Sequence, residues 1–169
     1  MSKTPEEKKA GDLLIPASAY PQLPAWATLR EALVQLTLEQ EALSMHERRR
    51  KVLIFGEDYL LAGVLTQADI LKALDPKLSQ TPWDAAPSWQ DLNTSAAHQQ
   101  MEERVSRFMS AAGPGISLQE DLLRASQLML QAQVDILPVY QENQLKGMLR
   151  LEDVFHQVSR AILTPIPGA

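Results

Sequence analysis

Three histidines, His46, His98 and His156, are the residues best suited to metal or acid–base chemistry, but they lie far apart in the sequence. His46-Glu47 begins like the helix motif of zinc proteases, in which a second histidine follows three residues after the glutamate. Arg50 occupies that position, so the motif lacks a ligand. The chain contains no cysteine, which excludes thiolate metal sites, disulfides and cysteine nucleophiles.

Phosphate and nucleophile motifs are missing as well. The sequence contains no G-x-S-x-G, no phosphate-binding loop and no G-x-G-x-x-G pattern. Its one glycine-rich spot, Gly113-Pro114-Gly115, is interrupted by a proline without a backbone N–H and is typical of a turn. The sequence therefore predicts that the protein is not an enzyme and holds no metal.

Two predicted helix starts share a pattern, a polar residue three positions before an aspartate, and a helix start of this kind could bind an anion. Thr66-Gln67-Ala68-Asp69 has the form of a capping box, in which the hydroxyl and the carboxylate satisfy free amides at a helix N-terminus. The same helix end attracts phosphates. In the second occurrence, Arg150 replaces the hydroxyl three residues before Asp153. Arg150 could bind a phosphate, or it could pair with Asp153 or Glu152 and block the site; the sequence leaves both alternatives open.

Internal repetition indicates which elements position these residues. Residues 52–65 resemble residues 136–149 at an offset of 84, and the same offset relates Asp69 to Asp153. Each copy reads as a short apolar strand, a polar turn, a second strand with a glycine, and then a helix, predicted over 70–74 and 154–162. The repeat predicts two related units that share one architecture.

A helix precedes each predicted hairpin. Thr28 and Glu31 form a capping box before a helical apolar pattern that extends to Gln40, and Asp121 can cap the helix that begins at Leu122. The helix starts differ by 93 rather than 84, so the first copy carries nine extra residues, which we place around residues 43–50. Short apolar stretches, residues 13–16 and 105–109, are predicted to begin the two repeats.

These patterns divide the chain into five predicted segments. A tail over residues 1–11 precedes a first repeat over 12–76, and an ordered linker over 77–103 precedes a second repeat over 104–163. Thr94 or Ser95 could cap a helix through Arg104 within the linker, which also contains two tryptophans. Residues 164–169 form a second tail, because Pro165 and Pro167 cannot continue a helix.

Composition limits the class of partner and compartment. Hydrophobic residues make up 45% of the chain and charged residues 22%, values typical of a globular protein. No apolar run reaches the ~18–20 residues of a membrane span, and the N-terminus lacks a signal-peptide core. A net charge of −5 argues against general nucleic-acid binding. We therefore expect a cytoplasmic protein without nucleic-acid or membrane partners.

With this repeated order of elements, the sequence resembles the CBS domain pair, or Bateman module, of the stand-alone bacterial type. The resemblance rests on residues 63–69, on residues 135–139 and 147–153, and on Phe108-Met109-Ser110. It implies an α+β fold of tandem β-α-β-β-α CBS repeats with pseudo-twofold symmetry. It also implies dimerisation into a flat disc and clefts between the repeats that bind adenosine-containing ligands.

The resemblance further implies which residues contact a nucleotide. In such modules the hydroxyl residue three before the aspartate contacts phosphate, the aspartate binds the ribose hydroxyls, and backbone near the leading segment and the first hairpin strand holds the base. Transferred to this sequence, the candidate nucleotide-binding residues are Thr66, Asp69, Ile15, Pro16, Val52, Leu53, Met109, Ser110, Ile136, Pro138, Arg150 and Asp153.

Two functional hypotheses follow from the resemblance. In the first, the protein is a homodimeric sensor that binds AMP, ADP, ATP or S-adenosylmethionine and regulates a protein partner in trans. In the second, it is a ligand-free homodimeric interaction scaffold with the same fold. The apolar faces of the helices at residues 29–36 and 122–129 are the expected dimer contacts.

Overall fold

The computed structural model describes residues 3–80 and 82–165. The chain divides into two compact units, and their limits do not follow the sequence repeats. The central unit holds residues 20–111, while the terminal unit joins residues 1–19 to residues 112–169. Residues 12–19, predicted to open the first repeat, therefore belong to the unit that contains the second repeat.

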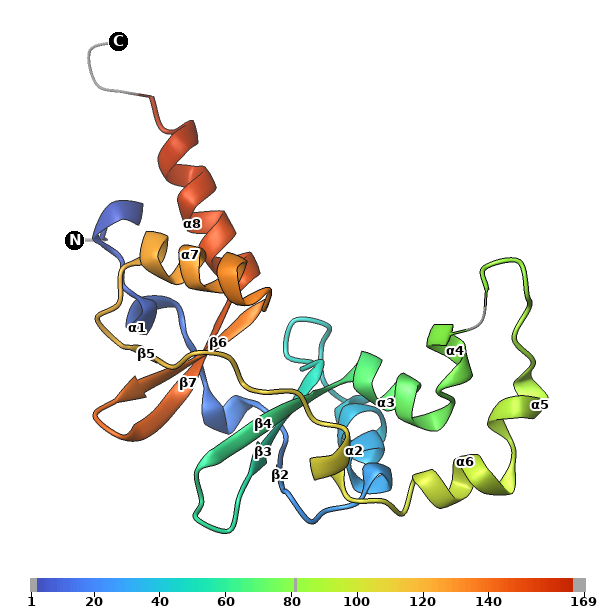
Figure 1. The fold of residues 1–169 in the computed structure, drawn as a ribbon. Helices are drawn as coiled ribbons and strands as arrows, with labels where there is room; N and C mark the ends of the chain where they lie inside the picture. The colour runs from blue at the N-terminus through green and yellow to red at the C-terminus, as the bar shows by residue number, and fades with distance from the viewer. Residues whose placement is uncertain (1–2, 81, 166–169) are drawn as a thin grey trace. The chain divides into compact units, whose positions relative to one another are not determined.

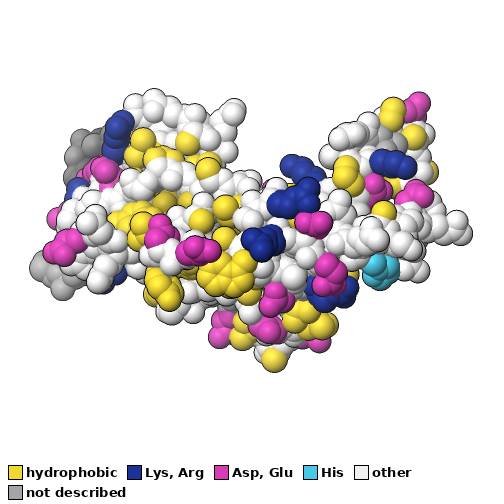
Figure 2. Space-filling model, turned by 60° about the horizontal axis from the view of Figure 1, so that its bottom comes forward, with side chains coloured by type: hydrophobic (Ala, Val, Ile, Leu, Met, Phe, Trp, Pro, Cys, Tyr) yellow, Lys and Arg dark blue, Asp and Glu magenta, His cyan; other side chains and the backbone are white. Residues whose placement is uncertain are grey.

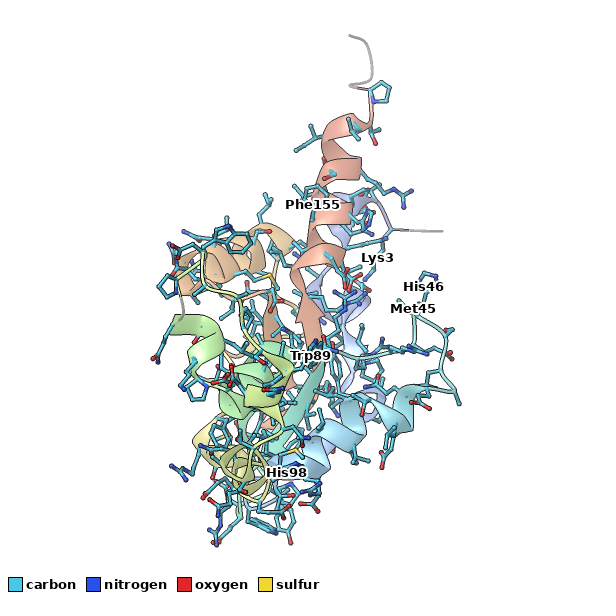
Figure 3. All side chains as sticks on the ribbon, turned by 90° about the vertical axis from the view of Figure 1, so that its right-hand side faces the viewer. Lys3, Met45, His46, Trp89, His98 and Phe155 are labelled. Carbon is cyan, nitrogen blue, oxygen red and sulfur yellow. The ribbon has the colours of Figure 1, made fainter. Side chains whose placement is uncertain are left out.

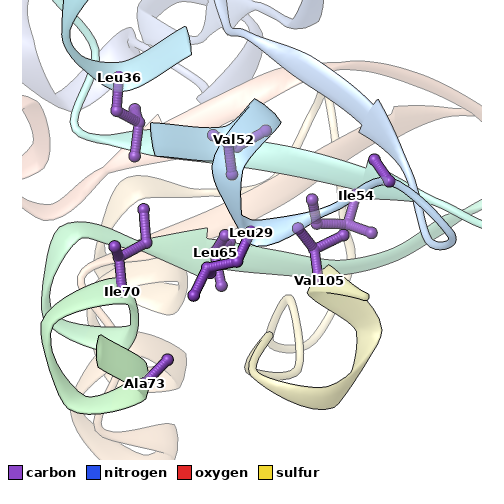
Figure 4. Packing of buried hydrophobic residues seen from close by; sticks show 10 residues of the cluster. Leu29, Leu36, Val52, Ile54, Leu65, Ile70, Ala73 and Val105 are labelled. Carbon is purple, nitrogen blue, oxygen red and sulfur yellow. The ribbon is translucent and has the colours of Figure 1, made fainter. Parts of the chain in front are cut away.

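The central unit is a three-stranded sheet with two helices packed against it (Figure 1). Strand β3 lies in the middle, parallel to β2 and antiparallel to β4. Figure 4 shows the buried side chains that the sheet and the helices share, among them Leu29, Leu65 and Ile70. The elements are β2 (Gln22–Pro24), α2 (Leu29–Leu36), β3 (Lys51–Phe55), β4 (Leu61–Thr66) and α3 (Gln67–Leu74).

The terminal unit repeats this order and adds one strand. Strand β7 lies between β6 and β1, and β5 completes the other edge parallel to β6. Its separate core contains Leu137, Leu149 and Val154, together with Ala10 from the N-terminal region. The elements are η1 (Pro5–Glu7), α1 (Ala10–Leu13), β1 (Ile15–Pro16), η2 (Ala17–Ala19), β5 (Ile116–Ser117), α7 (Leu122–Ala132), β6 (Ile136–Gln141), β7 (Gln144–Arg150) and α8 (Leu151–Leu163).

Both units therefore show the predicted β-α-β-β-α order, and the α+β class is confirmed. In each unit the first strand lies at a different place in the sequence from the one predicted. It is β2 or β5, which runs parallel to the middle strand of its sheet, rather than the apolar stretch at residues 13–16 or 105–109. Two or three residues form each of these strands, which is too short for a periodic signal.

The helix starts are confirmed at the predicted caps. Thr28 accepts a hydrogen bond from the Glu31 amide, and Asp121 accepts one from the Leu123 amide. This bond also holds the pKa of the Asp121 carboxyl below its ordinary value. The buried positions in each helix recur at i, i+3 and i+7, as expected for one apolar face. They are Leu29, Ala32 and Leu36 in α2, and Leu122, Ala125 and Met129 in α7.

Two predicted helix ends are wrong. Helix α2 stops at Leu36, and Gln40 belongs to a separate short turn, η3 (Leu38–Gln40). Gln40 is buried, and its side-chain amide donates to the carbonyls of Gln35 and Arg49, which ties the segment of extra residues around 43–50 to the unit. In the linker, α6 (Ser95–Gln100) ends before Arg104, which instead forms a bridge to Thr28.

The linker and tails also differ in detail from their predicted ranges. The linker holds α4 (Lys77–Gln80) and α5 (Trp89–Leu92) besides α6, but Trp83 and Trp89 are exposed and do not anchor it to a core. The N-terminal tail does not extend to Ala10, which is fully buried. Pro165 follows α8 without helix or strand, and Pro167 lies outside the described residues.

The strand pairing shows that the offset between the two repeats is not 84 throughout. In the central unit Ile54 pairs with Gly63, and in the terminal unit Val139 pairs with Gly147. The second strands are related by 84, whereas the paired first-strand residues are related by 85, because the first hairpin is one residue longer. Leu53, rather than Ile54, therefore corresponds to Pro138.

A close backbone approach requires the glycine in each second strand. Ser110 pairs with Val64, so a Cβ on Gly63 would meet the Ser110 carbonyl oxygen at 2.6 Å. Pro16 pairs with Gly147, and a Cβ there would meet the Ile15 carbonyl oxygen even more closely. Real side chains do not tolerate such contacts. Both glycines thus allow a segment from outside the local repeat to lie against the hairpin.

We predict that Gly147→Ala lowers the free energy of unfolding by about 1–3 kcal/mol, the usual range for overpacking. The added methyl can be accommodated only if the Ile15 backbone moves away from β7. Gly56→Ala is the matched control, because its nearest neighbour is the movable end of the Asp58 side chain. Urea denaturation of both variants provides the measurement. Equal effects of the two substitutions would contradict the role assigned to Gly147.

Candidate functional site

The twelve candidate residues separate into two sets of six, each within one unit. In the central unit, the leading segment at residues 105–110 crosses β4: the Val64 and Ser110 backbones exchange two hydrogen bonds of 2.9 Å. This pairing places Ser110 opposite Val64, two positions along the strand from Thr66, and Met109 directly precedes Ser110. The first set is Val52, Leu53, Thr66, Asp69, Met109 and Ser110.

The second set has the same construction in the terminal unit. Strand β1 pairs with β7, with Ile15 opposite Met148 and Pro16 opposite Gly147. The set is Ile15, Pro16, Ile136, Pro138, Arg150 and Asp153. By sequence order Ile15 and Pro16 belong to the first repeat. The pairing of β1 with β7 puts them instead in the same unit as Arg150 and Asp153.

The capping box predicted at Thr66 is confirmed. The Thr66 hydroxyl accepts a hydrogen bond from the Asp69 amide at 3.1 Å and donates to Asp69 Oδ2 at 2.7 Å. Oδ2 also accepts from the Thr66 amide at 2.8 Å. Among the described residues nothing bonds Asp69 Oδ1. The half-buried carboxylate therefore keeps one oxygen available to a donor from a ligand.

Lys51 adds a positive charge that the sequence analysis missed. It is the residue directly opposite Thr66 in the β3–β4 ladder. Directly opposite residues carry their side chains on the same face of a sheet, with Cβ atoms ~4.5–5.5 Å apart. Lys51 and Thr66 lie fifteen residues apart in sequence, so only the strand register identifies them as neighbours. In the terminal unit the corresponding residue opposite Arg150 is Ile136.

Arg150 pairs with Asp153, which is one of the two alternatives that the sequence left open. Arg150 Nε lies 2.7 Å from Asp153 Oδ2, and Nη2 lies 2.9 Å from Oδ1. Nη1 also approaches Glu152 Oε1 at 2.5 Å. The Arg150 side chain makes no cap hydrogen bond to α8. Both carboxylate oxygens of Asp153 are thus engaged by one guanidinium, unlike those of Asp69.

Four of the apolar candidate residues have buried side chains. Val52 and Leu53 are fully buried, and Ile136 and Pro138 are buried as well. The Leu53 amide donates to the Pro21 carbonyl at 2.9 Å. In contrast, Met109 is half-buried and Ser110 is exposed, so their side chains remain able to contact a ligand.

His46 and His98 lie in different segments of the central unit, and His156 lies on α8 of the terminal unit. Figure 3 labels His46 in the 41–50 segment and His98 on α6, and His98 Nε2 lies 3.2 Å from Asn93 Oδ1. Within residues 3–80 and 82–165, no three histidine or carboxylate side chains gather closely enough to hold a metal ion. Nor is any described helix both long and apolar enough to cross a membrane.

Charged side chains of both signs lie on one face of the molecule (Figure 2). Figure 2 shows basic and acidic side chains interspersed on the face that it draws. Several are locally paired, including Arg30 with Glu102 and Arg107 with Glu103.

Comparisons with known proteins confirm the resemblance to CBS domains. The family model described as CBS domain matches residues 105–160. CBSX2 in complex with AMP aligns with a TM-score of 0.61 at 18% identity, covering 92% of this chain and 98% of that one. CBSX2 from Arabidopsis thaliana gives 0.65 at 16% identity, with coverages of 94% and 99%.

A third similar structure is the CBS domain of a bacterial CNNM/CorC family Mg2+ transporter in complex with ATP. Its TM-score is 0.64 at 16% identity, covering 92% of this chain and 89% of that one. At these identities the likeness establishes the fold: the chain has the architecture of CBS-pair proteins. No curated protein matches the sequence.

We predict that Thr66→Ala lowers the free energy of unfolding by about 1 kcal/mol, the typical value of an N-cap. The substitution removes the acceptor for the Asp69 amide. Thr66→Ser keeps the hydroxyl and is expected to restore most of the loss. Thermal unfolding monitored by circular dichroism measures both. A full-sized loss in the serine variant would show that the methyl group, rather than the cap, stabilises this turn.

Proposed function

We propose that this chain, which has the fold of CBS-pair proteins, binds an adenine nucleotide at the first set of residues and regulates a partner protein in trans. The observation that carries the proposal is the arrangement at the start of α3. There, Asp69 Oδ1 is available to a ligand, next to a hydroxyl at a helix N-terminus.

The chemistry of this arrangement suits a nucleoside phosphate. Ribose hydroxyls are donors, and Asp69 Oδ1 is an acceptor that can take one or two of them. A phosphate is favoured at the first turn of α3, where amides lack intrahelical acceptors and the helix dipole is positive. Lys51, opposite Thr66, adds a charge of the correct sign. The half-buried Met109 offers apolar contact to a base.

The similar structures support the same ligand class. CBSX2 is described in complex with AMP, and the transporter CBS domain in complex with ATP. ADP and S-adenosylmethionine contain the same adenosine group and belong to the same proposal. In all of them the adenosine would contact Asp69 and the backbone near Leu53, while the substituent at the 5′ position would lie toward Thr66.

We predict that AMP, ADP or ATP raises the melting temperature of the full chain. A ligand at 100 times its dissociation constant stabilises the folded state by about 2.7 kcal/mol. A thermal-shift panel that also contains NAD and S-adenosylmethionine measures the effect and ranks the ligands. If none of the five shifts the melting temperature, the protein is better described as a ligand-free scaffold.

The same panel tests the assignment of Asp69. Asp69→Asn keeps the size of the side chain but removes the charge, and we expect at least a tenfold loss of affinity for the preferred ligand. Asp91→Asn, an equal change on α5, is the matched control and should leave the affinity unchanged. Unaltered binding by Asp69→Asn would place the nucleotide elsewhere.

We also propose that the chain forms a homodimer through α7 and α8 of the terminal unit. Large apolar side chains project from these helices into solvent, including Phe155, which Figure 3 labels on α8. The exposed set is Leu123, Leu130, Phe155, Ile162 and Leu163. Exposed apolar surface of this kind commonly marks an interface. Helix α2 offers less support, because Leu29 and Leu36 are buried.

Multi-angle light scattering at micromolar concentration should give twice the mass of the chain. We predict that Leu123→Glu combined with Leu130→Glu yields a monomer, since the interface would then have to bury two unpaired charges. Gln131→Glu adds a charge at an exposed position of the same helix and serves as the control. A monomeric native chain, or a double variant that stays dimeric, would contradict this interface.

A further inference from the structure

We infer that Arg150 closes the second set of residues to nucleotides, so that it is the residue that restricts the chain to a single nucleotide. The inference rests on the proposed function of the first set. It concerns a specific difference between two otherwise corresponding helix starts, Thr66 before α3 and Arg150 before α8.

The backbones at these two positions have nearly the same shape. Thr66 has φ −102° and ψ 163°, and Arg150 has φ −98° and ψ 143°; both are extended N-cap conformations. Asp69 and Asp153 each follow three residues later, in the first turn of the helix. The two starts therefore differ in side chain rather than in main chain, and the difference can be reversed by substitution.

The guanidinium of Arg150 is hydrogen-bonded to the Asp153 carboxylate, which a ribose would need as its acceptor. Its Nε and Nη2 bond the two oxygens of Asp153 at 2.7 and 2.9 Å in a bidentate arrangement. The side chains are 32% and 26% exposed, so water screens this pair less than a fully exposed one. Bidentate arginine–carboxylate pairs are among the stronger charge-assisted contacts. A ribose hydroxyl, which is neutral, does not replace a guanidinium at these oxygens.

Electrostatics also disfavours a phosphate that would use Arg150 as its ligand. Glu152 Oε1 lies 2.5 Å from Arg150 Nη1, so two carboxylates already surround the one guanidinium. A phosphate that displaced them would leave both negative charges beside it. The residue across the ladder is Ile136, whereas the first set has Lys51 there. At this position the second set therefore has no cation that could offset the repulsion.

Replacing the arginine should convert the second set into a copy of the first. In Arg150→Thr the sequence from 150 to 153 has the same first and last residues as Thr66 to Asp69. The matched backbone allows the new hydroxyl to accept from the Asp153 amide, as Thr66 does from Asp69. One oxygen of Asp153 is then available to a ribose, and the helix N-terminus becomes accessible to a phosphate.

Isothermal titration of the full chain with AMP tests the inference through stoichiometry. The native chain should bind one equivalent, and Arg150→Thr should bind two. Adding Asp153→Asn to Arg150→Thr should return the value to one. Arg160→Thr, the same substitution at the exposed last turn of α8, is the control and should remain at one. Arg150→Gln, which keeps the length but not the charge, provides a second way to open the set if the threonine variant does not fold.

Each outcome separates this inference from the proposed function. Two equivalents on the native chain would overturn the inference. So would one equivalent on a folded Arg150→Thr or Arg150→Gln variant whose melting temperature is close to that of the native chain. If the native chain binds no AMP but Arg150→Thr binds one equivalent, the inference holds and the assignment of Thr66 and Asp69 fails. If neither chain binds AMP or any other ligand of the thermal-shift panel, both fail.

Discussion

Each hairpin of this protein is paired with a segment that the sequence attaches to the other repeat, and the rest of the structure depends on this exchange. Ser110, at the end of the segment 105–110, pairs with Val64 of β4, and residues 15–16 pair with β7. Neither contact is possible with a side chain at Gly63 or Gly147. The compact units therefore cut across the repeats, and unfolding of either leading segment is expected to expose the edge of a sheet that belongs to a distant part of the chain.

The exchange also determines which residues can act together. Met109 and Ser110 join Thr66 and Asp69, while Ile15 and Pro16 join Arg150 and Asp153. The two resulting sets share a backbone plan but differ in charge placement. In the first, Lys51 lies across the ladder from a hydroxyl, and Asp69 keeps an oxygen available. In the second, the cation is Arg150, which is itself the N-cap residue of α8 and bonds both carboxylate oxygens of Asp153. Two units with the same fold thus present two chemically different sets of residues.

Local chemistry was predictable from the sequence, whereas pairing between distant segments was not. The capping boxes at Thr28 and Thr66 and the ion pair of Arg150 involve residues three apart, which a helix brings together without outside help. Lys51 was missed because its proximity to Thr66 depends on strand register, and the register of the hairpins differs by one residue from the sequence offset. The partners of residues 13–16 and 105–110 were misassigned for the same reason: a two-residue bridge has no periodic pattern, and sequence proximity suggests the wrong hairpin.

The central claim is that one set of residues binds a nucleotide and the other does not. Methyl-labelled methionine spectra recorded during an AMP titration test it most directly, because Met109 belongs to the first set and Met148 lies opposite Ile15 in the second. We predict that the Met109 signal shifts and saturates at one equivalent while the Met148 signal stays in place. A shift of Met148 with Met109 unchanged, or equal shifts of both, would contradict the account.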